Sequence, residues 1–562
     1  MSRARTLRVF SLILPLLAFS ISTSEPAFGI GAPVLVKDIN PGSAGSNPQS
    51  LLSVAGGLFF AAQNAANGVE PWASDATEPG TTLLADANPG ASSGFGGNCL
   101  ANEICEAVRI GSTVYFSAYT GIGGPRLWRT DGTSAGTSIV YSDAAMIDLE
   151  NVAGTLYLAA VPTGFSTASL WTSDGTAGGT TQVTTNVFVA GNLTDVNGTL
   201  FFSGTNGFLG SEIWKKDGSP GGASMVKDLN PGSPDNGATF LTNVNGTLFF
   251  FGIDAAGGGL CKSDGTDAGT FRLKSLTMEA NQFTSGQIVD ANGTAFLIAS
   301  DGASGMELWK SDGTVGGTVL VKDIYPGSPG GLSGSFLVAI GSTVYFAASD
   351  GAVGRELWKS DGTEAGTVLV KDIYPGFGEF GASTPAGLAG VNGKLFFRAE
   401  SPSPSGHQLW MSDGTEAGTV RIAIMNPSGN CLAQSFTGVG SDVFFSGTNG
   451  TSGVELWVMS DEPVGVGPNE ANASGSVALA QNQPNPVRAT TQISYSIPVV
   501  QHVLLKLYDV SGRELHTLVN GQQPAGVHQV EVDVRGLLPS GVYFYRLETE
   551  RGVLRKKMVL AR

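Results

Sequence analysis

The sequence predicts an all-β protein: a β-propeller-like ring of about eight to nine four-stranded blades, followed by a small Ig-like β-sandwich. Three observations support this. The 562 residues include 80 glycines and 27 prolines but only 14% charged residues, which indicates short strands joined by tight turns. One segment recurs nine times, as in ELWKSDGTEAGTVLVKDIYPG at 356–376 and its near copy at 307–327. The two ends of the repeated region also complement each other.

Each repeat unit divides into four short β segments. In the seventh unit they are SFLVAI (335–340), TVYFAAS (343–349), RELWKS (355–360) and VLVKDI (368–373), separated by glycine-containing turns. In other units the first turn is Asn-Gly, as at 197–198, which is a strong hairpin signal because both residues must accept positive φ. Four antiparallel strands in one unit match a propeller blade.

One position in the unit holds every tryptophan of the chain. Adjacent residues of the third segment, such as Leu357 and Trp358, point to opposite faces and are both apolar, as expected of a blade covered on both sides. We therefore expect a structural repeat core in which the aromatic fills the space between blades, with a looser contact where Cys261 replaces it. The tryptophans are Trp72, Trp128, Trp171, Trp214, Trp309, Trp358, Trp410 and Trp457.

The ends of the repeated region predict closure of the ring. VLVKDINPG at 34–42 is a fourth segment without the first three, and the ninth unit ends after VELWVMSD at 454–461 without a fourth. If the N-terminal strand completes the last blade, no sheet edge stays open. An open solenoid with polar caps is the alternative, and nine units could also form an irregular or split ring.

The motif ELWKSDGT at 307–314 and 356–363 is similar to the defining motif of the bacterial ELWxxDGT repeat proteins. Close variants are EIWKKDGS at 212–219 and QLWMSDGT at 408–415, whereas EPWASDAT at 70–77 departs from the pattern. The resemblance covers most of residues 34–461. It implies an exported repeat protein, and it brings no assigned chemistry.

The repeated polar residues have a structural and a functional interpretation. Seven aspartates open a D-G-[TS] turn, and each could hold calcium, but the further oxygen donors of a calcium loop are missing. An Asx-type turn is favoured, with the carboxylate accepting backbone N–H groups. These structural turn residues are Asp131, Asp174, Asp217, Asp264, Asp312, Asp361 and Asp413.

A recurring glutamate lies two residues before the tryptophan position, as at Glu307, and a recurring lysine lies in the fourth segment, as at Lys322. We expect them to pair as a structural ladder rather than to act as catalytic carboxylates. Histidine is almost absent from the repeats, where only His407 occurs, and no nucleophile, metalloprotease or phosphate-loop motif is found. The sequence thus predicts no catalytic, cofactor-binding or metal residues, and no cofactor.

The first 29 residues are typical of a signal peptide: three arginines precede the apolar run VFSLILPLLAFSI, and small residues follow. No later segment is apolar for long enough to form a transmembrane helix.

Cys99 and Cys105 could close a small loop by a disulfide, whereas the paired spacings of a zinc site are missing. Residues 477–562 carry +4, so the net charge of −16 leaves −20 on the rest, which disfavours nucleic acid as a partner.

The C-terminal region predicts a separate module. EPVGVGPNEANASGS at 462–476 has the composition of a linker, and about seven alternating segments follow. QNQPNP (481–486), LKLYDVSGREL (505–515), LPSGVYFYRL (538–547) and KKMVLAR (556–562) resemble the type A sorting domain of the type IX secretion system and the related FlgD-type Ig-like domain. This implies that residues 477–562 engage the outer-membrane secretion machinery and deliver the chain to the outside of the cell.

The domains are thus predicted as a signal peptide (1–29), a repeat propeller (30–461), a linker (462–476) and a sorting domain (477–562). The favoured function is a secreted or surface-displayed, non-catalytic binding or adhesion protein, with a glycan or protein ligand on a propeller face. A secreted glycan hydrolase or lyase and a structural surface component are the alternatives. The longest departures from the repeat lie in the eighth unit, where Glu379 and Glu400 are the only candidate carboxylates for an enzyme.

Overall fold

The computed structural model describes residues 30–561 apart from 55, 91–106, 122–123, 184–186, 208–209, 218–221, 232–236, 279–287, 328–329, 333, 377–381, 404, 461–477, 483–484, 486, 489, 498–499, 510–512, 525, 536–538 and 550–551. The predicted signal peptide, the linker and the Cys99–Cys105 bridge lie outside the described residues and stay predictions. Among the described residues every regular element is a strand.

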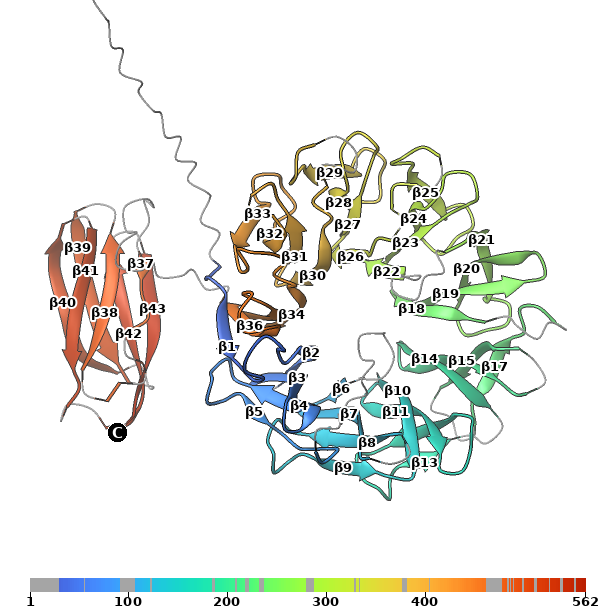
Figure 1. The fold of residues 1–562 in the computed structure, drawn as a ribbon, viewed down its shortest axis with the longest axis horizontal. Coiled ribbons are helices and arrows are strands. Elements are labelled where there is room, and N and C mark those ends of the chain that lie inside the picture. Colours follow the sequence, from blue (N-terminus) through green and yellow to red (C-terminus); the bar gives the residue numbers. More distant parts are fainter. Residues whose placement is uncertain are drawn as a thin grey trace, which may run out of the picture.

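Nine four-stranded antiparallel sheets form a closed ring, with the first strand of each blade nearest the ring axis (Figure 1). The predicted all-β propeller is therefore confirmed, with nine blades. Blades one to four contain β2 (Gln49–Val54), β3 (Gly57–Asn64), β4 (Gly68–Ser74), β5 (Thr82–Leu83); β6 (Ala107–Ile110), β7 (Thr113–Tyr119), β8 (Pro125–Thr130), β9 (Ser138–Tyr141); β10 (Ala144–Val152), β11 (Thr155–Pro162), β12 (Ser169–Ser173), β13 (Thr181–Gln182); and β14 (Phe188–Val196), β15 (Thr199–Thr205), β16 (Glu212–Lys216), β17 (Ser224–Lys227).

Blades five to nine continue in the same order, except that the last takes its fourth strand from the N-terminus. They contain β18 (Thr239–Val244), β19 (Thr247–Asp254), β20 (Gly257–Ser263), β21 (Phe271–Ser275); β22 (Ile288–Ala291), β23 (Thr294–Ala299), β24 (Glu307–Ser311), β25 (Val319–Lys322); β26 (Val338–Ile340), β27 (Thr343–Ala348), β28 (Glu356–Ser360), β29 (Val368–Lys371); β30 (Ala386–Val391), β31 (Lys394–Glu400), β32 (His407–Ser412), β33 (Val420–Ala423); and β34 (Gln434–Val439), β35 (Asp442–Gly447), β36 (Glu455–Ser460), β1 (Val34–Lys37).

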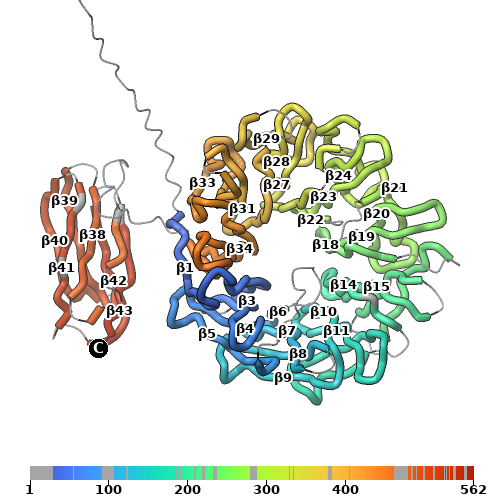
Figure 2. The backbone as a smooth tube through the Cα atoms, in the orientation of Figure 1, coloured from blue at the N-terminus to red at the C-terminus, as the bar shows by residue number. Residues whose placement is uncertain are grey.

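The ring is closed by β1, which pairs antiparallel with β36 and places Leu35 opposite Trp457. Figure 2 shows the N-terminal strand beside the last blade of the wheel. The predicted closure is thus confirmed, and the open-solenoid alternative is wrong. Because the strands alternate in direction, the first hairpins and the D-G-T turns share one face of the ring. The links between second and third strands and the crossovers between blades share the other, which we call the crossover face.

The core lies between the blades. In each contact the aromatic of one third strand meets apolar residues of the preceding blade, as Trp358 of blade seven meets Val321 and Leu308 of blade six. All eight tryptophans are 2–8% exposed, and Cys261 takes the same place between blades four and five. The turns follow their chemistry: Asn197 and Gly198 both have positive φ, of 53° and 83°.

The C-terminal residues form two sheets on one shared core that includes Tyr545, Leu505 and Ile493. One sheet has the order β37-β38-β41 and the other β40-β39-β42-β43. Their strands are β37 (Ala478–Leu479), β38 (Thr490–Ile497), β39 (Gln501–Tyr508), β40 (Glu514–Gln523), β41 (Gly526–Asp533), β42 (Gly541–Thr549) and β43 (Gly552–Leu560).

Candidate functional site

The repeated aspartates organise their own turns. The Asp312 carboxylate accepts hydrogen bonds from the Thr314 backbone N–H (2.8 Å) and hydroxyl (2.7 Å), and the Thr314 side-chain bond holds the pKa of Asp312 below its usual value. Thr314 in turn accepts from the Gly317 N–H at 2.9 Å. The same aspartate–threonine pair of bonds occurs at Asp131, Asp174, Asp264, Asp361 and Asp413. The turn after Asp217 lies partly outside the described residues.

The second glycine of the motif is required by this carboxylate. A Cβ added at Gly317 would lie 2.0 Å from Asp312 Oδ1, which is far inside contact distance. The same overlap is found between Gly366 and Asp361. The string D-G-T-x-x-G-T is therefore a compact turn in which one side chain fills the space that a later Cβ would need, and its chemistry is structural.

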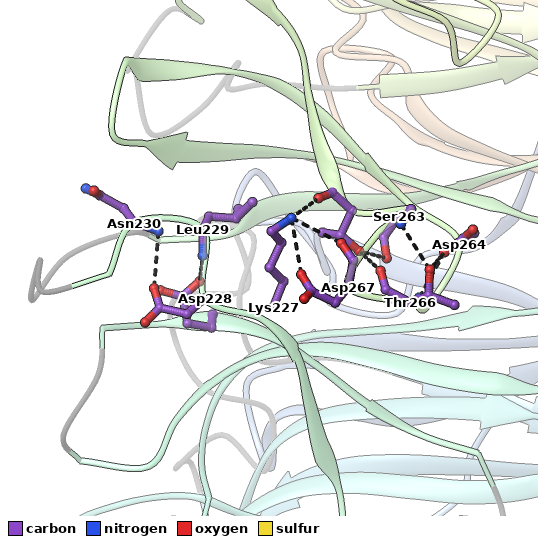
Figure 3. A network of polar contacts seen from close by, with 11 residues as sticks. Lys227, Asp228, Leu229, Asn230, Ser263, Asp264, Thr266 and Asp267 are labelled. Atoms are coloured by element: carbon purple, nitrogen blue, oxygen red, sulfur yellow. Dashed lines mark hydrogen bonds and ion pairs between the residues drawn. The ribbon is translucent and has the colours of Figure 1, made fainter.

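The recurring cations bind the D-G-T turn of the next blade. Lys227 of blade four donates to the Thr270 carbonyl at 2.9 Å and forms an ion pair with Asp267 at 3.2 Å, both in blade five (Figure 3). Lys37, Lys322 and Lys371 likewise donate to Thr81, Thr367 and Thr419 carbonyls at 2.8–2.9 Å. From the third strands, Arg129, Lys215 and Lys359 donate to the turn-glycine carbonyls of the next blade.

The recurring glutamates fix the crossovers. The fully buried Glu356 accepts from the Ile373 N–H (2.9 Å), the Ser383 N–H (2.8 Å) and the Ser383 hydroxyl (2.5 Å). Glu307 accepts from three backbone N–H groups of its crossover. The predicted glutamate–lysine ladder is wrong for these residues, because the carboxylates and the lysines bind backbone groups at different places.

Glu455 makes the same kind of latch across the ring closure. It is fully buried and accepts from Ile39 N–H (3.1 Å), Asn40 N–H (3.4 Å), Ser46 N–H (2.8 Å) and the Ser46 hydroxyl (2.5 Å). Burial raises the pKa of Glu455 to about 6 in spite of these donors. The repeated acids and bases thus serve the scaffold, and a functional site must be sought where a blade departs from the repeat.

Blade eight departs from the repeat on the crossover face. Gln408 takes the place of the latch glutamate, is fully buried, and donates from Nε2 to the carbonyls of Asn426 (2.8 Å) and Gly429 (2.9 Å). Beside it, His407 contacts the Thr384 hydroxyl through Nε2 at 2.7 Å and the Asn430 amide oxygen through its backbone N–H at 2.8 Å. A neutral, hydrogen-bonded group therefore replaces the buried carboxylate here.

Arg398 lies in the same blade, on β31. Its Nη1 donates to the Ala433 carbonyl at 2.9 Å and to Gln434 Oε1 at 3.4 Å, at the start of the innermost strand of blade nine. The side chain is half-buried, and this burial lowers the pKa of the guanidinium. Arg398 is not among the residues predicted from the sequence, although a single arginine within the apolar string LFFRA is a visible signal.

The two carboxylates considered for an enzyme do not form a pair in the described residues. Glu379 lies outside the part of the chain that the structure describes. Glu400 Oε1 accepts the Gly406 N–H at 3.5 Å. The described residues contain no group of three metal-ligating side chains, and Cys261 and Cys431 are buried free thiols. No helix in the described part of the chain is long and apolar enough to cross a membrane.

Comparison with solved structures gives propeller-containing proteins at low identity. A puromycin hydrolase has TM-score 0.36 and 13% identity over 72% of this chain and 59% of its own. A puromycin-hydrolyzing peptidase of Mycobacterium tuberculosis has TM-score 0.36 and 14% identity, with 68% and 63% covered. The β-propeller domain of the Trilobed protease from Pyrococcus furiosus has TM-score 0.30 and 10% identity, with 60% and 98% covered.

A search of the curated proteins finds no match to the chain. Residues 483–561 match the family model described as the secretion system C-terminal sorting domain. This confirms the type IX sorting domain predicted from QNQPNP and KKMVLAR, and it makes the chain a secreted protein directed to the outer cell surface. The nine-bladed ring is thus the cargo of a C-terminal sorting domain.

Proposed function

We propose that this protein is a non-catalytic binding protein that is displayed on the cell surface or released, and that presents the crossover face of its propeller to a ligand. One observation carries the proposal. The polar residues that recur in the repeat are engaged in turns, latches and contacts between blades, as Asp312, Glu356 and Lys227 are. Their structural roles therefore explain why they recur, and no catalytic role is needed.

A catalytic alternative needs acid and base groups held in one place, with matched protonation. Glu307, Glu356 and Glu455 are buried and consumed by backbone donors, so they cannot reach a substrate. The residues that differ between blades, such as His407 and Arg398, form a polar group that suits recognition. Binding residues are commonly carried on segments that a rigid scaffold positions, as the altered segments of blade eight are here.

The relation of the ring to the ELWxxDGT repeat proteins, and of the sorting domain to FlgD-type Ig-like domains, is part of the same proposal. It is supported by ELWKSDGT at 307–314 and by LKLYDVSGREL at 505–515. Engagement of the outer-membrane machinery belongs to residues 477–562, and ligand binding belongs to the ring.

The test uses the exported protein in two parallel measurements. A glycan and protein array measures binding, and chromatography of the bound ligand after prolonged incubation measures turnover. We expect retention on a defined set of ligands, with the ligand recovered intact. Conversion of any of them at a rate above that of a heat-denatured sample would replace this proposal by the hydrolase or lyase alternative.

A further inference from the structure

Arg398 occupies a place that is neutral in every other blade. It pairs with Leu409, the residue before the tryptophan of its blade. The same register places only small or apolar residues at this point elsewhere: Ala61, Ser117, Ala159, Ser203, Phe251, Ile298, Ala347 and Ser446. One blade in nine thus carries a charge at a position that the architecture fills without one.

The charge of Arg398 is not neutralised by a carboxylate in the described residues. Its two hydrogen-bond acceptors, the Ala433 carbonyl and Gln434 Oε1, are neutral, and both accept from Nη1, so neither engages Nε or Nη2. A half-buried cation without an ionic partner is costly to hold unless something else binds it. Its planar fork is suited to a carboxylate, which it can bind with two parallel hydrogen bonds.

The groups around Arg398 in blade eight do not form an ion pair with it in the described residues. The latch position that is glutamate in blade seven is the neutral, buried Gln408 here, so blade eight carries no latch carboxylate. Glu400, two residues along the same strand, has its Oε1 near the Gly406 N–H at 3.5 Å. Gly387 has φ +63°, and an added Cβ would lie 2.9 Å from Arg398 Nη1 and 3.0 Å from the Ala433 carbonyl oxygen, so glycine suits this close approach.

We propose that Arg398 binds the carboxylate of an acidic sugar at the junction of blades eight and nine. This inference rests on the proposed binding function and names its ligand class. The exposed side chains of Gln434 and Ser435, at the start of β34, supply amide and hydroxyl groups for sugar hydroxyls. Residues 1–476 carry a net charge of −20, which repels polyanions. This favours a mostly neutral glycan with isolated carboxylates over a polyacid.

The experiment is a calorimetric titration of the exported protein with a matched pair of probes: a xylo-oligosaccharide with one glucuronic acid side group, and the same oligosaccharide without it. We expect binding of the acidic probe and at least about tenfold weaker binding of the neutral one. Arg398→Gln should weaken binding of the acidic probe by about 10- to 100-fold and leave the neutral probe unchanged. Arg398→Lys, which keeps the charge but not the fork, should fall between the two.

Arg421→Gln is the matched control, because Arg421 is in the same blade and donates to the Ser401 hydroxyl (3.1 Å) and the Ser403 carbonyl (2.7 Å). It should bind like the wild type. Equal affinity of the wild type for the two probes, or undiminished binding by Arg398→Gln, would overturn the inference. A glutamate-rich peptide that binds with the same dependence on Arg398 would overturn the sugar assignment.

The two proposals fail in different ways. Binding of array ligands that does not depend on Arg398 leaves the binding function in place and removes this site. Turnover of the acidic probe removes the non-catalytic function, whatever Arg398 does. If Arg398→Gln does not fold, as judged by its melting curve, the comparison of the two probes on the wild type and on Arg398→Lys decides the question.

Discussion

Replacing Glu455 by alanine should loosen the N-terminal strand from the ring. The carboxylate accepts four hydrogen bonds, from Ile39, Asn40 and twice from Ser46, residues more than 400 positions away in sequence. At about 1 kcal/mol for each donor left buried without an acceptor, the loss is about 4 kcal/mol. Relief of the buried charge offsets about 2 kcal/mol of this at neutral pH, because the pKa of Glu455 is raised from 4.5 to about 6.

The net effect, about 2 kcal/mol, should appear as local opening. Hydrogen exchange followed by mass spectrometry should show residues 34–47 exchanging about 30-fold faster, since opening free energy sets the exchange rate. The pKa adds a pH dependence: it is raised in the folded state, so the contribution of Glu455 is fully present below about pH 4.5 and is lost as the pH rises through about 6. The alanine variant should lack this dependence.

Glu356→Ala is the matched control. Glu356 makes the same latch to Ile373 and Ser383, but there the chain runs continuously through the crossover. We expect a lower melting temperature and a modest local rise in exchange at residues 368–376, with no selective release of the N-terminal strand. Equal loss of protection around the whole ring in both variants would refute the reasoning, because it would mean that the closing blade is no weaker than the others.

Three further substitutions test the packing and the charges. Trp358→Ala should lower the free energy of unfolding by about 3–5 kcal/mol in denaturant titrations, because the indole is 5% exposed and fills the space between blades six and seven. Glu150→Gln should raise stability by about 1–2 kcal/mol at pH 8 and leave it unchanged below pH 4.5, since burial raises the pKa of Glu150 to about 7 and solvent screens the half-buried group. Gln408→Glu should destabilise by about 2–4 kcal/mol at pH 8, with partial recovery at pH 5, because it sets a buried carboxylate against two carbonyl oxygens.

The fold could be predicted because the turns carry their own chemistry. An Asn-Gly hairpin such as 197–198 admits few conformations, and the D-G-T turn is completed by residues within seven positions of the aspartate. The ring closure was also readable, because a fourth segment at 34–42 stands without its blade. Contacts between residues that are close in sequence can be predicted without a structure. The same holds for the strand pairing that a single missing segment implies.

The role of the glutamates could not be predicted in the same way. Glu356 binds the backbone N–H groups of a crossover, up to 27 residues along the chain, and every residue except proline offers such a group. No particular residue type in the sequence therefore marks the partner of the glutamate. The recurring lysine was the wrong partner to predict for it. Lys322 donates to the backbone carbonyl of Thr367, 45 residues further along the chain, and a backbone carbonyl likewise cannot be recognised from residue type.

Arg398 shows why the candidate site needed the register of the strands. In the sequence it is a single arginine within the apolar string LFFRA of the eighth unit, and the string alone does not show which residues of other blades hold the same place in the sheet. In the structure the pairing with Leu409 makes it equivalent to eight neutral residues, and only then does its charge stand out. A repeat protein offers this comparison within one chain. Residues that recur in the blades serve the scaffold, as Glu356 and Lys322 do. A charged residue that occurs at this position in one blade alone is not needed by the scaffold, and we attribute it to a ligand.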